Sequence, residues 1–164
     1  MKNSYLNRLS QSLPFAAILL IAVICSSYIQ KQQDKNSYTG KEFKSLRWLE
    51  GTWKGTADGE APFFEKYEFV NDTLMQITYY SDSSLKKGST DGGVYFSGGK
   101  IYHNYKSALW ELKQLDGKSA AFVPLRRASN SFTWKYTSPN EWTATLFAAN
   151  DSKGKTYRLQ RIKK

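Results

Sequence analysis

The stretch Arg47–Gly55, RWLEGTWKG, places two tryptophans and two glycines at the start of a long region rich in strand-forming residues. Leu49, Gly51, Trp53 and Gly55 alternate large and small side chains, and the residues between them are polar. This period of two is typical of a strand with one buried face. Glycines permit the sharp curvature and close backbone approach found where a barrel closes. The stretch therefore predicts a first strand whose Trp53 plugs one end of a barrel.

The chain beyond this stretch repeats short runs of Thr, Tyr, Phe, Trp and Val between Gly, Asn, Asp, Ser or Pro, which is an antiparallel β pattern. The candidate strands cover residues 49–57, 63–70, 73–80, 92–97, 100–106, 108–115, 118–123, 130–137, 141–148 and 154–162. A helical pattern precedes them only at residues 41–49. We expect an all-β, antiparallel up-and-down meander of about ten strands that closes into a barrel or folds as a sandwich, and closure is favoured because it removes exposed edges.

The first 29 residues are predicted to be an export segment. Lys2 and Arg8 precede the apolar run 13–24, which predicts a hydrophobic helix of the length of a signal-peptide core. Residues 22–25, AVIC, resemble the lipobox of bacterial lipoproteins, in which Cys25 becomes lipidated. An uncleaved membrane anchor and free secretion are the alternatives. We expect an exported cell-envelope protein with a signal or anchor at 1–29, a polar linker at 30–44 and a barrel domain at 45–164.

The net charge and the cysteine count limit the kinds of partner and of stabilisation that the domain can have. The formal net charge of +10 favours anionic partners, whereas interspersed acidic residues favour an ordinary soluble surface with excess lysine. Export argues against nucleic acid as the partner. Cys25 is the single cysteine, so no intramolecular disulfide forms and the core alone must stabilise the domain.

The segment RWLEGTWKG, with Gly51-x-Trp53 after a short helix-like start, resembles the opening of lipocalins and their calycin relatives. Residues 49–60 followed by 62–72 are similar to the opening of nitrobindin-type barrels, and residues 121–146 followed by 156–162 are similar to uncharacterised bacterial lipocalin-like domains. The resemblance implies a cavity that holds a small, mostly apolar molecule. Nitrobindin-type barrels bind haem through a late histidine, and this chain has none after His103, so no cofactor is expected.

The last strand adds one candidate through a further resemblance. Tyr157-Arg158-Leu159 is similar to the tyrosyl and basic residues with which fatty-acid-binding barrels hold a carboxylate. The candidate ligand-binding residues are Trp53, Glu65, Tyr67, His103, Tyr105, Trp134 and Arg158. An inward Glu65 can pair with Arg158 or Arg161 on the closing strand, because a charge inside a barrel is costly unless it is paired or hydrated.

The direction of Glu65 is open from the sequence. The carboxylate faces the interior if its alternating neighbours Phe63 and Tyr67 do, but it is solvated if Phe64 and Val70 face inward instead. His103 shares a face with Tyr105, where a lone histidine is usually a hydrogen-bonded wall residue and less often a ligand or a proton carrier. Trp134 belongs to the regular alternation 132–137 and is either barrel core or a platform for a flat ligand.

Catalysis has little support in the sequence. A Ser-His-Asp arrangement would need His103, yet no nucleophile-elbow pattern surrounds any serine, and no His and carboxylate cluster has metal-ligand spacing. We expect no enzyme and no metal site. The leading hypothesis is a membrane-tethered carrier of a small apolar or amphipathic molecule. The alternatives are a cell-envelope interaction module acting through its basic outer surface, and an enzyme using His103 and Glu65.

Overall fold

The computed structural model describes residues 37–163. The expected export helix, Cys25 and the start of the polar linker lie outside the described residues. No helix within 37–163 combines the length and apolar character needed to cross a membrane.

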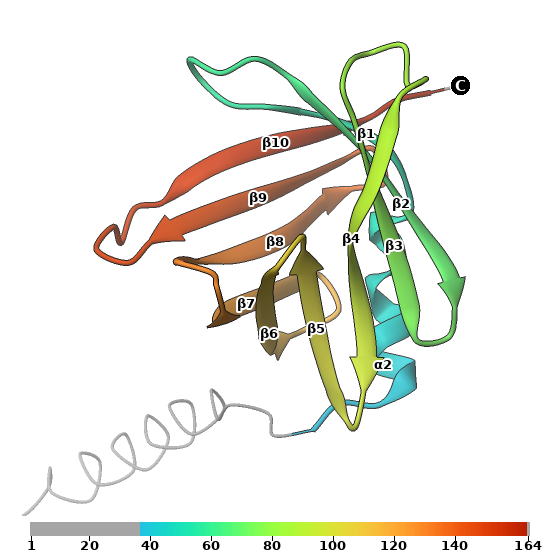
Figure 1. Ribbon diagram of the computed structural model, residues 1–164, viewed down its shortest axis with the longest axis vertical. Helices are drawn as coiled ribbons and strands as arrows, with labels where there is room; N and C mark the ends of the chain where they lie inside the picture. Colours follow the sequence, from blue (N-terminus) through green and yellow to red (C-terminus); the bar gives the residue numbers. More distant parts are fainter. Residues whose placement is uncertain (1–36, 164) are drawn as a thin grey trace, which may run out of the picture. The chain divides into compact units, whose positions relative to one another are not determined.

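Ten antiparallel strands form one closed barrel, in which each strand pairs with its neighbours in the chain and the last strand pairs with the first (Figure 1). The strands are β1 (Gly51–Thr56), β2 (Phe63–Asn71), β3 (Leu74–Tyr80), β4 (Gly88–Ser97), β5 (Lys100–Tyr105), β6 (Ala108–Leu115), β7 (Ser119–Arg126), β8 (Asn130–Ser138), β9 (Glu141–Ala148) and β10 (Lys155–Arg161). The all-β meander predicted from the sequence is confirmed, and the barrel is the outcome rather than the sandwich.

Two short helices precede the barrel, α2 (Gly40–Lys44) and η2 (Ser45–Leu49). Thr39 and Glu42 form a capping box at the start of α2, in which each side chain accepts a hydrogen bond from the other residue's backbone N–H. The α2 residue Phe43 is fully buried against Phe69 and Phe96, and Tyr38 is buried as well. The packed unit therefore includes residues 38–44, which the sequence pattern assigns to the linker.

Trp53 and Arg161 close one end of the barrel. The β1–β10 pairing sets them opposite each other, and the Arg161 guanidinium carbon lies 4.1 Å from the centre of the Trp53 ring. Arg161 also donates hydrogen bonds to the carbonyls of Glu50 and Pro139, at 2.7 Å and 2.8 Å. Gly51 makes this possible, because its φ is +133° and a Cβ there would lie 2.0 Å from Arg161 Nη1.

Trp53 completes its own hydrogen bonding at this end, since its Nε1 donates to the Leu49 carbonyl at 2.7 Å. We call this region the closed end. We assign to it Trp53, Arg161 and six fully buried apolar residues of the same core cluster: Phe43, Leu46, Leu49, Met75, Ile101 and Leu112.

The strand register defines the opposite end of the interior. Gly55 pairs with Phe63, Gly92 pairs with Tyr105, and Tyr157 pairs with Ala144, so these residues share the inner face further along the barrel. We call this region the open end. The antiparallel pairing thus gives each strand one part in the closed end and another in the open end.

Candidate functional site

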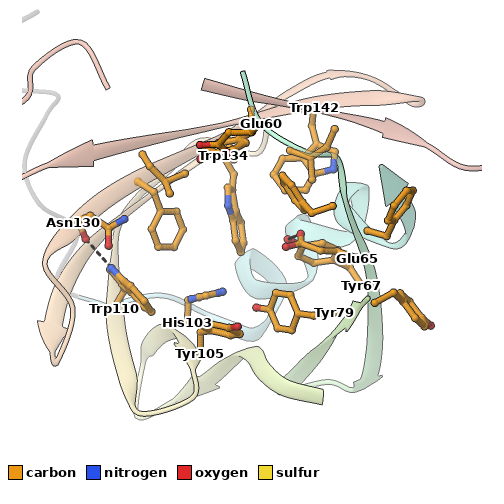
Figure 2. A pocket seen from close by; sticks show the side chains of 18 residues that line it. Glu60, Glu65, Tyr67, Tyr79, His103, Tyr105, Trp110, Asn130, Trp134 and Trp142 are labelled. Atoms are coloured by element: carbon orange, nitrogen blue, oxygen red, sulfur yellow. Dashed lines mark hydrogen bonds between the residues drawn. The ribbon is translucent and has the colours of Figure 1, made fainter. Parts of the chain in front are cut away.

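The open end of the barrel contains a cavity of about 490 Å³ that opens to solvent (Figure 2). Its wall is mostly aromatic and comes from β2, β3, β5, β6, β8, β9 and β10, with one residue from the β1–β2 loop. The lining residues are Glu60, Phe63, Phe64, Glu65, Tyr67, Tyr79, Tyr80, His103, Tyr105, Trp110, Asn130, Phe132, Trp134, Trp142, Ala144, Leu146, Tyr157 and Leu159. A hollow rather than solid interior is what a small-molecule site requires.

Glu65 is directed into this cavity from β2 (Figure 2). It pairs with Trp53 on one side and with Tyr79 on the other, and all three therefore share the inner face. The alternative in which Phe64 and Val70 face inward and Glu65 is solvated is excluded, because Val70 is 54% exposed, although Phe64 is itself buried and lines the cavity. The inward direction of Glu65 follows from its register with Trp53 and not from the composition of β2, which is apolar on both faces.

The surroundings of Glu65 change its protonation. Burial raises the pKa of its carboxyl to about 7, although the hydrogen bond from Tyr67 Oη to Glu65 Oε2, 2.7 Å long, acts in the opposite direction. Burial and the nearby carboxyl also raise the pKa of Tyr67 and of Tyr79. At neutral pH both phenols stay protonated, and Glu65 changes charge near pH 7.

The expected pairing of Glu65 with Arg158 or Arg161 is wrong. On β10 the inward residue is Leu159, so its neighbour Arg158 faces outward with a side chain that is 64% exposed, and its Nε lies 3.9 Å from Glu141 Oε1. Arg161 is held on the ring of Trp53 at the closed end. Among residues 37–163 the hydrogen-bond partner of the Glu65 carboxyl is Tyr67.

Tyr79 and Tyr105 form the wall next to Glu65. Their ring centroids are 4.8 Å apart in an edge-to-face arrangement, which aromatic pairs prefer. Gly92 lies between them on β4, and a Cβ there would meet Tyr79 Oη at 2.6 Å and the Asn104 carbonyl at 3.0 Å. The glycine therefore leaves the space that the Tyr79 ring occupies.

His103 lies in a cage of aromatic rings. The centroids of Trp110, Phe132 and Trp134 are 5.3, 5.3 and 5.4 Å from that of the imidazole, and Phe122 is 6.0 Å away. The side chain is 7% exposed, and its Nδ1 has no hydrogen-bond partner within the described chain. Burial lowers the pKa of His103 to about 3, so the imidazole is neutral at physiological pH.

Trp110, Trp134 and Trp142 line the cavity, and the indole N–H groups of Trp110 and Trp142 differ in their hydrogen bonding. Trp110 Nε1 donates to the Asn130 carbonyl at 2.7 Å (Figure 2). Trp142 Nε1 is buried without a partner in the described residues. The rings of Trp134 and Trp142 are 5.8 Å apart, and each also packs against Tyr67. The aromatic wall is therefore continuous from His103 to Glu65.

The structure gathers five of the seven sequence candidates at the cavity: Glu65, Tyr67, His103, Tyr105 and Trp134. Trp53 lies at the closed end and Arg158 on the outer surface, so neither lines the cavity. Sequence reasoning missed Tyr79, although the alternation Met75, Ile77, Tyr79 could have placed it on the inner face. Within the described residues no group of three or more His, Cys, Asp or Glu side chains is arranged to hold a metal ion.

Comparison with known proteins gives little further information. No family model matches the chain. No curated protein matches it. Among solved structures it is similar to "Structure of a redesigned beta barrel, b11L5F_LGL", with 12% identity, a TM-score of 0.36, and coverage of 73% of this chain and 96% of that one.

Two further similar structures contain a named molecule. One is "Structure of a redesigned beta barrel, mFAP1, bound to DFHBI", with 15% identity, a TM-score of 0.35, and coverage of 71% of this chain and 98% of that one. The other is "Structure of EF1p2_mFAP2b bound to DFHBI", with 13% identity, a TM-score of 0.32, and coverage of 72% and 97%. Likenesses of this size carry no conclusion about function, which has to be argued from the cavity.

Proposed function

We propose that this protein is a lipocalin-like barrel that binds or carries a small, mostly apolar or amphipathic molecule in the cavity at its open end. The cavity itself carries the proposal. Its volume of about 490 Å³ lies within the range of roughly 300–1,000 Å³ that is usual for sites of small ligands, and its wall is aromatic with few polar groups. A solidly packed interior would instead have favoured a module acting through its basic outer surface.

The proposal contains no catalytic step. His103 is neutral at physiological pH and is surrounded by rings, and its side chain has no hydrogen-bonded acid or base partner within residues 37–163. Glu65 is hydrogen-bonded to Tyr67, whose raised pKa keeps the phenol protonated. No hydrogen bond joins His103 and Glu65 within residues 37–163, so the enzyme alternative lacks the paired histidine and carboxylate on which it depends.

Export and membrane attachment through residues 1–29 belong to the same proposal and rest on the sequence alone. The full-length chain and its Cys25→Ser variant, compared after metabolic labelling with a fatty acid, test the attachment. Label on the wild type that is lost in the variant supports a lipoprotein. An unlabelled wild type leaves the uncleaved anchor or free secretion.

Filling the cavity tests binding. Ala144 lies on the cavity wall, 7% exposed, whereas Ala121 lies on the outer face of β7 between two buried residues. We expect native mass spectrometry of the full-length chain, after incubation with a lipid extract, to show a bound molecule on the wild type and on Ala121→Phe but not on Ala144→Phe. A bound mass on all three, or on none, would contradict the proposal.

A further inference from the structure

The charges of the cavity differ from those of the whole chain. The chain carries 24 Lys and Arg against 14 Asp and Glu, yet the described residues that line the cavity include two glutamates, Glu60 and Glu65, and neither lysine nor arginine. Glu60 lies in the loop before β2 and pairs with Lys155. Glu65 is therefore the one cavity-lining carboxyl of the described chain that has no basic partner.

The Glu65 carboxyl has room for a further contact. Its Oε2 accepts the hydrogen bond of Tyr67, and its Oε1 accepts none from the described residues. Figure 2 shows the carboxyl directed into the cavity, near Tyr79 and on the same side as Tyr67. A carboxylate that loses water without gaining a cation is destabilised, so a positively charged group of a ligand would be favoured at this position.

The rings around the cavity favour the same charge. The face of an aromatic ring is negative and attracts ammonium and guanidinium groups, and cages of such rings are a known way to recognise quaternary ammonium ligands. Cations of this chain already lie on its rings. Lys106 Nζ is 5.3 Å from the centre of the Tyr105 ring and Lys155 Nζ is 5.7 Å from that of Tyr157, and both tyrosines line the cavity.

The positive surface of the chain does not cancel this preference. The two cations that lie on cavity-lining rings, Lys106 and Lys155, are solvent-exposed, and Lys155 is also paired with Glu60. Arg126, Arg127 and Lys153 are solvent-exposed as well. Interactions of exposed charges are weakened by water and salt. Inside the cavity an interaction with Glu65 is screened much less.

We propose in addition that the ligand is an organic cation, an inference that rests on the proposed function. Its aromatic or alicyclic body would lie in the aromatic part of the cavity, and its ammonium or alkylated ring nitrogen would lie against Glu65. A fatty acid or another anion is the ligand that this lining disfavours, because its carboxylate would meet Glu65 without a compensating cation. The outward direction of Arg158 removes the group that the fatty-acid-binding resemblance offered for that purpose.

Binding of such a ligand is linked to pH. Since the pKa of Glu65 is about 7, most of the carboxyls are neutral at pH 6 and most are charged at pH 8. The other titratable groups that line the cavity are Glu60 from the β1–β2 loop, Tyr67 from β2, Tyr79 and Tyr80 from β3, His103 and Tyr105 from β5, and Tyr157 from β10. Tyr67, Tyr79 and Tyr157 have raised pKa values and His103 a pKa of about 3, so these four keep their charge over this interval.

Three ligands of nearly the same shape test the charge preference. N-methylquinolinium is a permanent cation, 1-methylnaphthalene is neutral, and 1-naphthoate is an anion. Binding to the full-length chain is followed by quenching of tryptophan fluorescence, since three of the five tryptophans line the cavity. At pH 8 we expect the cation to bind about tenfold or more tightly than the neutral ligand, and the anion most weakly.

The wild type alone supplies a second measurement. Because the cation binds the charged carboxyl, its affinity should rise about tenfold from pH 6 to pH 8, while that of the neutral ligand stays within about twofold. This result does not depend on whether a variant folds. A cation affinity that is flat or falls over this interval would overturn the assignment.

Glu65→Gln removes the charge and keeps the shape. It should lower the affinity of the cation at pH 8 about tenfold, leave the neutral ligand within about twofold, and abolish the pH effect. Glu68→Gln is the matched control, because Glu68 is exposed on the outer face of the same strand, where it pairs with Lys66. If only the neutral or the anionic ligand binds tightly, the cation assignment fails and the proposed function stands. If none of the three binds, both fail.

Discussion

The closed and open ends of the barrel are built by the same strands, a few residues apart, but some of their polar side chains differ in whether they have hydrogen-bond partners. At the closed end Trp53 Nε1 and the Arg161 guanidinium are hydrogen-bonded to backbone carbonyls. At the open end His103 Nδ1 and Trp142 Nε1 are buried without partners in the described chain. An unsatisfied buried group costs roughly 1–3 kcal/mol, so His103 and Trp142 lower the stability of the cavity region. Trp48 Nε1 in η2 is also buried without a partner in the described residues, so this cost is not confined to the open end. Unsatisfied buried groups are often found at functional sites.

Glycine serves the two ends in different ways. At the closed end Gly51 adopts a positive φ and lets a charged side chain approach the backbone. At the open end Gly55 leaves space for the ring of Phe63, whose Cζ would lie 2.1 Å from a Cβ, and Gly92 does the same for Tyr79. The first glycine stabilises the barrel, and the other two let aromatic rings enter the cavity wall.

The largest effect is expected at the closed end. Trp53→Ala removes a fully buried side chain that contacts Trp142 and the Arg161 guanidinium, and should lower the free energy of unfolding by about 3–5 kcal/mol. Urea unfolding followed by circular dichroism measures this change. Val70→Ala, at an exposed apolar position, is the control and should cost less than about 0.5 kcal/mol. Equal effects of the two variants would mean that Trp53 does not hold the closed end together.

The next effect belongs to Glu65 and depends on pH. The folded pKa is raised from 4.5 to about 7, so between these values the unfolded chain releases a proton that the folded chain keeps, and stability falls as pH rises. The loss is complete above pH 7 and reaches at most about 3 kcal/mol, since each pKa unit is worth about 1.4 kcal/mol. Wild type should therefore lose stability relative to Glu65→Gln between pH 4.5 and 7. A parallel pH dependence of the two proteins would place the carboxyl in water.

A smaller effect is expected for Gly92→Ala. The new methyl group would meet Tyr79 Oη and the Asn104 carbonyl, so the ring or the backbone must shift, at about 1–3 kcal/mol. Gly40→Ala is the matched control, because a Cβ there meets nothing within 4 Å and its φ is not positive. Thermal unfolding should separate the two variants clearly. If Gly92→Ala is as stable as Gly40→Ala, the wall between Tyr79 and Tyr105 is looser than described.

The smallest effect concerns the helix that packs against the closed end. Thr39→Ala removes the oxygen that accepts a hydrogen bond from Glu42 N at 3.3 Å, and should cost about 1 kcal/mol of stability. Thr39→Ser keeps an oxygen at the same position and should stay within about 0.5 kcal/mol of wild type. A loss of the same size in both variants would count against the capping role.

The sequence predicts the strands well and the side-chain partners less well, for physical reasons. Alternating residues such as Phe132, Trp134 and Tyr136 encode a strand locally, whereas the choice between barrel and sandwich depends on the pairing of β1 with β10, which is remote in the chain. Glu65 shows the same limit, because only the register with Trp53 decides its direction. The fatty-acid-binding resemblance predicts an inward Arg158, but the neighbouring Leu159 takes that position.

The five tryptophans provide the most direct test of the difference between the two ends. In the described chain Trp110, Trp134 and Trp142 line the cavity, whereas Trp48 and Trp53 do not. In a ¹H–¹⁵N correlation spectrum of the protein titrated with 1-methylnaphthalene, we predict that the indole N–H signals of Trp134 and Trp142 shift most, that of Trp110 less, and those of Trp48 and Trp53 least. Signals that all stay in place, or a largest shift at Trp53, would contradict a hollow open end that holds a small molecule.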